Sequence, residues 1–272
     1  MASTRPAALL VHGLGGTVYD LGSLGKTLED AGFVTHTPLL PGHGGMPEDL
    51  LGARWQDWVE AIAQSYRALK AKHGTVHLAG VCLGGLVALE VARQEQHSGR
   101  LALYAPPMFL DGWSLPRLTW ARHIVYRIPG LAERMRVPEA EPFGIKNVRL
   151  RKIIQQRFER GERFHYPYVP LACIREVDRL RHHLKARLAD IHCSTLIVHA
   201  AEDDITSPRS ARYLQQHLGG PVEYMPLNNS YHMVMVDNER NQVLERSQRF
   251  FSRPALNTSP ASNPHWGALA PA

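Results

Sequence analysis

The stretch HLAGVCLGGLVALEVA, residues 77–92, constrains the fold more than any other part of the sequence. It combines a short apolar run, a glycine-rich corner and an apolar pattern with helical spacing. A strand that turns directly into a helix at G-x-C-x-G lifts the middle residue, Cys82, above the edge of a parallel sheet. We expect Gly80 and Gly84 to be required there, because side chains would collide where strand and helix pack closely.

The rest of the chain alternates short aliphatic runs with helical patterns. We expect strands at 7–12, 33–39, 75–81, 100–105, 194–200 and 221–227, and helices at 21–32, 53–74, 83–96, 207–220 and 238–251. This alternation predicts an α/β fold, with a mostly parallel sheet covered by helices on both faces. Right-handed crossovers then bring the carboxyl ends of the strands to one edge, where sites form.

The alternation is interrupted between Tyr104 and Cys193 by a long segment rich in Arg, Pro and aromatic residues, in which we find no good strand candidate. At 272 residues the chain can still be one α/β domain with an insertion. The predicted organisation is a core over 1–105 and 191–252, a helical cap over 106–190 and a flexible tail over 253–272.

The basic charge of the chain is concentrated in one segment. The formal net charge is +6, and residues 106–190 hold 17 Lys and Arg against 9 Asp and Glu, a net of +8. Two interpretations follow: solvated helix faces, or a patch that meets an anionic partner.

The remaining composition indicates a soluble protein with reduced thiols. The three cysteines are an odd number without C-x-x-C spacing, which favours neither a disulfide framework nor a zinc site. The first apolar run is too short for a signal peptide, and no later run approaches the roughly 18 residues of a membrane span. We therefore expect a cytoplasmic protein without a membrane span.

We expect Cys82, at the corner, to act as a nucleophile. A nucleophile needs a base to accept its proton, and the base needs an acid that orients it. The best candidate for the base is His232, in the loop between the last predicted strand and the last helix. The best acid is Asp203, in the loop after the preceding strand, with Asp204 as the alternative. Nucleophile, acid and histidine then each lie at the carboxyl end of a strand. The amino end of the helix after Cys82 also favours negative charge on the sulfur.

Acyl chemistry through a tetrahedral intermediate also needs donors for the developing oxyanion. The glycines of HGLGGT, after the first strand, let the backbone turn sharply. We expect the N–H of Leu14 to point at the site and the N–H of Leu83 to be the second donor. His12 is expected to brace this loop rather than act as a base, and His43 to lie near the entrance.

Other patterns do not indicate a cofactor. LGKT at 24–27 has Asp20 where a phosphate-binding loop needs its first glycine, and HGLGG has Val18 where the dinucleotide fingerprint needs its third. His182 and His183 occupy adjacent helical positions, which point to different sides and do not form a metal site alone. We expect no cofactor, no metal and no nucleic-acid partner.

The motifs HGLGG, PLLPGHG, GVCLGG, HAAEDD and SYH stand in the order and spacing of a known family. Together they resemble the bacterial carboxylesterase and monoacylglycerol-lipase group of the α/β-hydrolase fold, over the chain up to about Phe251. Cys82 departs from the serine that is usual in that group. The G-x-C-x-G-G corner is similar to that of polyhydroxyalkanoate synthases, which share the fold and are normally much longer.

The cysteine changes the expected chemistry. A thiol paired with histidine forms a thioester acyl-enzyme, which amines, thiols and carbon nucleophiles attack more readily, relative to water, than an oxygen ester. We predict an acyl-transfer enzyme that hydrolyses esters or thioesters of medium acyl chains. The alternative is an acyltransferase or condensing enzyme, for which the basic segment would favour an acyl donor such as coenzyme A or acyl carrier protein. A binding protein without activity is the weakest interpretation, because base and acid are both present.

Overall fold

The computed structural model describes residues 5–116 and 118–253. Apart from Arg253, the predicted tail over 253–272 lies outside the described residues. Among the described residues, no helix is both long and apolar enough to cross a membrane.

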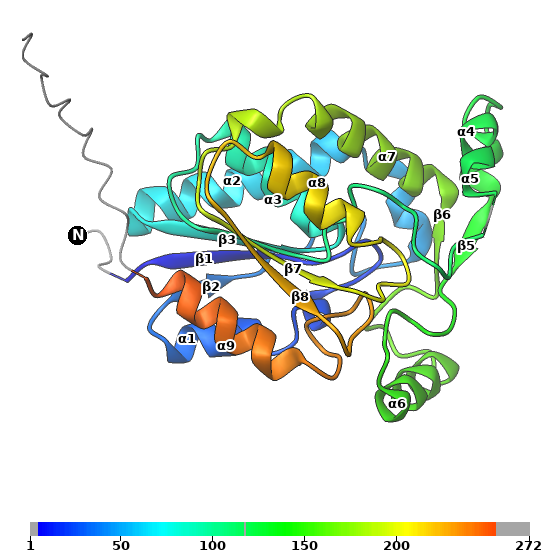
Figure 1. The fold of residues 1–272 in the computed structure, drawn as a ribbon. Coiled ribbons are helices and arrows are strands. Elements are labelled where there is room, and N and C mark those ends of the chain that lie inside the picture. The colour runs from blue at the N-terminus through cyan, green and yellow to red at the C-terminus, as the bar shows by residue number, and fades with distance from the viewer. Residues whose placement is uncertain (1–4, 117, 254–272) are drawn as a thin grey trace, which may run out of the picture.

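A parallel sheet of six strands forms the centre of the molecule (Figure 1). The strands are β1 (Ala7–Val11), β2 (Val34–His36), β3 (Val76–Val81), β4 (Leu101–Tyr104), β7 (Thr195–Ala200) and β8 (Val222–Leu227). They lie in the order β2-β1-β3-β4-β7-β8, and each neighbouring pair is parallel. The four inner strands are buried along their whole length, because helices cover both faces. The six predicted strands and the α/β architecture with a parallel sheet covered by helices on both faces are confirmed.

Helices cover the two faces in separate layers. The helices are α1 (Leu24–Asp30), α2 (Trp55–His73), α3 (Leu83–Gln94), α4 (Arg122–Val125), α5 (Leu131–Arg134), α6 (Val148–Glu159), α7 (Leu171–Lys185), α8 (Arg209–His217) and α9 (Arg240–Phe251), with 3₁₀ turns at Val18–Leu21, Pro47–Gly52, Thr119–Ala121 and Leu188–Asp190. Figure 1 shows α2, α3, α7 and α8 on one face and α1 and α9 on the other. Successive residues of β1 therefore enter different cores: Leu9 packs under α2 and α3, and Leu10 under α1.

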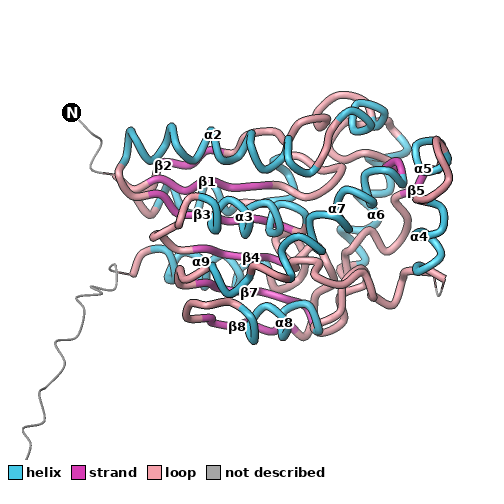
Figure 2. The backbone as a smooth tube through the Cα atoms, turned by 90° about the horizontal axis from the view of Figure 1, so that it is seen from above, coloured by secondary structure: helices cyan, strands magenta, loops and turns pink. Residues whose placement is uncertain are grey.

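The segment between β4 and β7 gathers at the end of the sheet where the strands finish (Figures 1 and 2). The prediction that it holds no strand is wrong: β5 (Arg136–Pro138) and β6 (Tyr168–Pro170) form an antiparallel pair. Each strand has only three residues and contains a proline, and the two strands are about thirty residues apart in the sequence. No local sequence pattern therefore predicts this pair of strands. The last helix of the segment, α7, packs against α2 and α3 and belongs to the layer on the sheet.

The corner between β3 and α3 brings two backbones into contact. A Cβ atom at Gly80 would lie 2.2 Å from the carbonyl oxygen of Gly84, and one at Gly84 would lie 2.2 Å from that of Val11. Cys82, between them, has φ 51° and ψ −119°, a left-handed conformation that side chains rarely adopt. The requirement for glycine at these two positions is thus confirmed, and it ties α3 to β1 as well as to β3.

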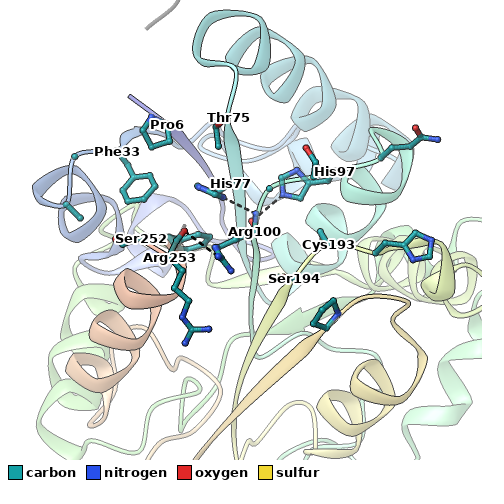
Figure 3. A pocket seen from close by; sticks show the side chains of 18 residues that line it. Pro6, Phe33, Thr75, His77, His97, Arg100, Cys193, Ser194, Ser252 and Arg253 are labelled. Atoms are coloured by element: carbon teal, nitrogen blue, oxygen red, sulfur yellow. Dashed lines mark hydrogen bonds between the residues drawn. The ribbon is translucent and has the colours of Figure 1, made fainter. Parts of the chain in front are cut away.

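A cavity of about 800 Å³ opens at the opposite edge, where the strands begin (Figure 3). Two buried histidines line it. The Nδ1 atom of His77 accepts the N–H of Arg100 at 2.9 Å, and Nδ1 of His97 lies 3.0 Å from the hydroxyl of Tyr66. Burial lowers the pKa of each histidine to about 4, and both are neutral at pH 7. None of the predicted site residues borders this cavity.

The corner generates the first prediction. Gly80→Ala and Gly84→Ala each place a methyl group on backbone oxygen that cannot move aside, and we expect each to lower the free energy of unfolding by about 2 kcal/mol or more. Urea denaturation measures the change. Gly52→Ala is the matched control, because nothing lies within 4 Å of its added carbon; an equal loss in that variant would contradict the steric explanation.

The buried histidines generate a second prediction. Unfolded histidines take up protons near pH 6.5, whereas His77 and His97 in the fold resist protonation until about pH 4. Stability is therefore full above pH 6.5 and falls as the pH drops from 6.5 to 4, by up to about 1.4 kcal/mol per pH unit for each histidine. We expect His97→Gln to make this slope shallower in denaturation series at several pH values. The exposed His182→Gln is the control, and an unchanged slope in His97→Gln would refute the assignment.

Candidate active site

Cys82 directly follows the last residue of β3, Val81, and is the N-cap of α3, so it lies at the edge where the strands end. Its N–H donates to the carbonyl oxygen of Tyr104 at 2.9 Å, and its carbonyl oxygen accepts the N–H of Gly85 at 2.9 Å. Residue Cys82 is partly exposed, in contrast to the buried Cys173 and Cys193. The strained corner thus fixes the backbone of the one partly exposed cysteine among the described residues.

His232 and Asp203 form a buried pair, although 28 residues separate them in the sequence. Nδ1 of His232 lies 2.9 and 3.0 Å from the two carboxylate oxygens of Asp203. The same carboxylate accepts the N–H groups of Ile205 and Thr206, each at 2.9 Å, so its orientation is fixed. Nε2 of His232 is buried and forms no hydrogen bond with the described residues.

Electrostatics favours a charged imidazole here. Burial opposes charge on His232, but the carboxylate of Asp203 and the sulfur of Cys82 outweigh it and raise the pKa of His232 well above its usual value. For Asp203, burial also opposes charge, and the imidazole of His232 nevertheless lowers the pKa of the carboxyl group. The pair is therefore built to hold a proton on His232 while Asp203 stays ionised.

Asp204, the alternative acid, has a different partner. Its carboxylate accepts the backbone N–H of His232 at 3.2 Å, and burial raises its pKa. Asp237 holds the same loop from the other side, since its carboxylate accepts the N–H groups of Tyr231 and Lys146 at 2.9 and 2.7 Å. The buried carboxylate of Asp237 thus links the loop that carries His232 to the segment after β5.

The loop after β1 closes over Cys82. A Cβ atom at Gly13 would lie 3.4 Å from the Cβ atom of Cys82. Its neighbouring N–H groups are engaged: that of Gly13 donates to Asp20 at 3.0 Å and that of Gly15 to Nε2 of His43 at 3.0 Å. Among the described residues, the N–H of Leu14 has no hydrogen-bond partner.

His12 and Leu83 complete the set of residues singled out from the sequence. Nδ1 of His12 lies 2.8 Å from the carbonyl oxygen of Gly13, and Nε2 accepts the N–H of Leu40 at 3.1 Å, so this side chain braces the loop. Burial lowers its pKa, which suits a neutral imidazole. Leu83 begins α3, and its N–H therefore has no partner within the helix.

Sequence reasoning missed three polar residues around the site. His199 lies at the end of β7, with Nε2 at 2.8 Å from the carbonyl oxygen of Thr206 and 3.6 Å from the Asp203 carboxylate. A histidine inside an otherwise apolar strand was the available signal. Asp20 and His165 lie 3.7 Å apart beside the loop after β1, and nothing in the sequence pairs residues so far apart.

Within residues 5–116 and 118–253, no group of three or more His, Cys, Asp and Glu side chains is arranged to hold a metal ion. The chemistry available to Cys82, His232 and Asp203 is nucleophilic attack with proton transfer.

A family model described as the alpha/beta hydrolase family matches residues 8–246. The chain is 28% identical over 248 residues to the thermostable monoacylglycerol lipase of Bacillus sp. (strain H-257), which covers 91% of this chain and 90% of that protein. It is 32% identical over 101 residues to a carboxylesterase of Bacillus subtilis (strain 168), covering 37% and 41% of the two chains.

A solved structure shares the fold. A soluble variant of monoglyceride lipase from Saccharomyces cerevisiae, in complex with a substrate analog, superposes with a TM-score of 0.75 at 16% identity and covers 93% of this chain and 87% of that one. The resemblance drawn from the sequence motifs is confirmed at the level of the family and of its lipase and esterase members.

The site geometry generates a prediction that needs no substrate. Iodoacetamide should alkylate Cys82, because burial raises the pKa of Cys173 to about 12 and that of Cys193 to about 11. Asp203→Asn removes the charge that stabilises the imidazolium, and we expect alkylation about tenfold slower or more. Asp204→Asn keeps an oxygen for the N–H of His232 and should change the rate little. Mass spectrometry of the alkylated peptides measures both, and a slower Asp204→Asn would make Asp204 the acid.

Proposed function

The chain belongs to the alpha/beta hydrolase family, and we propose that it hydrolyses carboxylic esters or thioesters of medium acyl chains through a thioester on Cys82. The observation that carries the proposal is the buried pair of His232 and Asp203 beside Cys82 at its strained corner. The identity with a monoacylglycerol lipase over nine-tenths of the chain supports an ester as substrate.

Acylation is the first half of the proposed reaction. The sulfur of Cys82 attacks the ester carbonyl carbon, and the carbonyl electrons move to oxygen to form the oxyanion. The N–H groups of Leu14 and Leu83 are the proposed donors to this oxyanion. When the oxyanion collapses, the carbon–oxygen bond to the alcohol breaks and His232 gives its proton to the leaving oxygen.

Deacylation returns the enzyme to its starting state. The neutral imidazole of His232 takes a proton from water, whose oxygen attacks the thioester carbonyl carbon. The carbon–sulfur bond then breaks, the carboxylic acid leaves, and sulfur and imidazolium are restored as a pair. Asp203 keeps Nδ1 protonated throughout, so that Nε2 always faces the reacting atoms.

A second candidate function is acyl transfer, and the observation that favours it is Cys82 itself. A thioester reacts with amines and thiols more readily, relative to water, than a serine ester does. The basic segment, residues 106–190, is the feature that would attract a donor carried on coenzyme A or acyl carrier protein. Its net charge of +8 already counts the acidic residues of α7 that pair with its arginines, since Asp178 binds Arg122 and Arg181, and Glu176 binds Arg179.

Substitution of the nucleophile tests the proposal. After incubation with p-nitrophenyl esters, a monoacylglycerol and acyl thioesters, intact-mass spectrometry should find one acyl group on the wild type and none on Cys82→Ala. Cys193→Ala, at a buried cysteine that lines the cavity at the opposite edge of the sheet, should be acylated as the wild type is. An acyl group retained in Cys82→Ala would refute the mechanism. Cys82→Ser should hydrolyse esters at least as well but transfer acyl groups to added amines or thiols less, and unchanged partitioning would exclude the transfer function.

A further inference from the structure

The loop after β1 is held by side chains from elsewhere in the chain. Besides the bonds of Gly13 and Gly15 to Asp20 and His43, the carbonyl oxygen of Gly15 accepts the N–H of Tyr166 at 2.8 Å. The hydroxyl of Thr17 donates to the carbonyl oxygen of Phe164 at 2.9 Å. The segment around 165, which precedes β6, thus forms part of the wall behind this loop.

Asp20 lies inside the curve of the loop. A Cβ atom at Gly16 would lie 1.8 Å from its carboxylate, and one at Gly13 would lie 3.0 Å from it, so the carboxylate fills the space that these glycines leave. Asp20 is only 4% exposed. A carboxylate so buried needs a cation or several donors to remain charged.

The cation is supplied by His165. Its Nδ1 lies 3.7 Å from a carboxylate oxygen of Asp20, and its Nε2 lies 3.7 Å from one of Glu139, which follows β5. The imidazole is itself largely buried, with 17% of its side chain exposed. Three parts of the chain that are remote in sequence therefore meet through one ring.

We infer that His165 is a positioning residue for the proposed reaction: its charged ring, between Asp20 and Glu139, keeps the loop after β1 in the shape that presents the N–H of Leu14 to the oxyanion. The inference rests on the proposed function for the identity of the reaction. Only two interactions connect His165 to Leu14. The ring pairs with the carboxylate of Asp20, which accepts the N–H of Gly13, the residue before Leu14.

The charges around the ring support this role. Burial disfavours the imidazolium, but Asp20 and Glu139 outweigh it and raise the pKa of His165 to about 10. The other titratable groups at the loop, His12 and His43, have pKa values lowered by burial, that of His43 to about 4, and are neutral. The positive charge of His165 is thus present across the neutral range and is lost only as the pH rises through about 10. The guanidinium of Arg157 lies farther along the same wall, over the rings of Tyr19 and Phe164, and pairs with Glu162.

Three variants isolate the charge: His165→Gln, Asp20→Asn, which keeps an oxygen for the N–H of Gly13, and the double variant. Each is measured by amide hydrogen exchange of residues 13–17, by the acylation rate with a p-nitrophenyl ester, and by alkylation of Cys82 with iodoacetamide. Alkylation involves no oxyanion, so it reports on the nucleophile and its base alone. His182→Gln, at an exposed histidine on α7, is the control.

We expect faster exchange over 13–17 in both single variants, acylation slower by about tenfold or more, and alkylation within about twofold of the wild type. The double variant should be acylated no more slowly than the slower single variant, because each single substitution already removes the ion pair between His165 and Asp20. Unchanged exchange, or acylation and alkylation that fall together, would overturn the inference. The wild type could instead exchange slowly over 13–17, and the variants quickly, while no acyl group forms on the wild type. That result would refute the proposed ester hydrolysis but confirm that His165 holds the loop.

Discussion

The contact between the β3–α3 corner and the end of β1 is the constraint on which the site depends. At Gly80 the backbone of β3 contacts that of α3, and at Gly84 the backbone of α3 contacts that of β1. A shift of α3 along the sheet would therefore make its backbone clash with β1. This contact holds Cys82 in its left-handed conformation and brings the loop after β1 alongside it. The nucleophile and the loop that would serve its oxyanion are therefore positioned by one steric fit, before any polar contact is counted.

Two of the buried histidines around the site, His232 and His165, are charged because facing carboxylates outweigh their burial. A single carboxylate does not always suffice: burial lowers the pKa of His199, although its Nε2 lies 3.6 Å from Asp203. His12 and His43 accept backbone N–H groups, and burial keeps them neutral. His232 and His165 face carboxylates, and these outweigh a similar burial. The same residue type thus braces a loop in one place and carries a proton in another. Desolvation acts on all of these histidines, and the nearby carboxylates outweigh it only at His232 and His165.

The sequence could predict the sheet because each strand is an aliphatic run with glycine or proline nearby. It could also place the candidate residues, since the carboxyl ends of parallel strands meet at one edge. It could not reveal β5 and β6, whose three-residue strands depend on each other across the fold. Nor could it pair Asp20 with His165, which are far apart in the sequence. It also could not separate the role of Asp204 from that of Asp203, because these neighbours on one loop differ only in the direction of their side chains.

The short β5–β6 pair has a further consequence. Just beyond it, the N–H of Glu139 donates to the carbonyl oxygen of Pro167 at 2.9 Å, so the chain between them leaves and returns at a single point. Between these joined ends the excursion is also tied to the loop of His232, because Asp237 accepts the N–H groups of Lys146 and Asn147. Here it carries His165, the ring that faces Asp20. A relative's segment placed here would therefore have to supply both a cation to the buried carboxylate of Asp20 and N–H groups to that of Asp237.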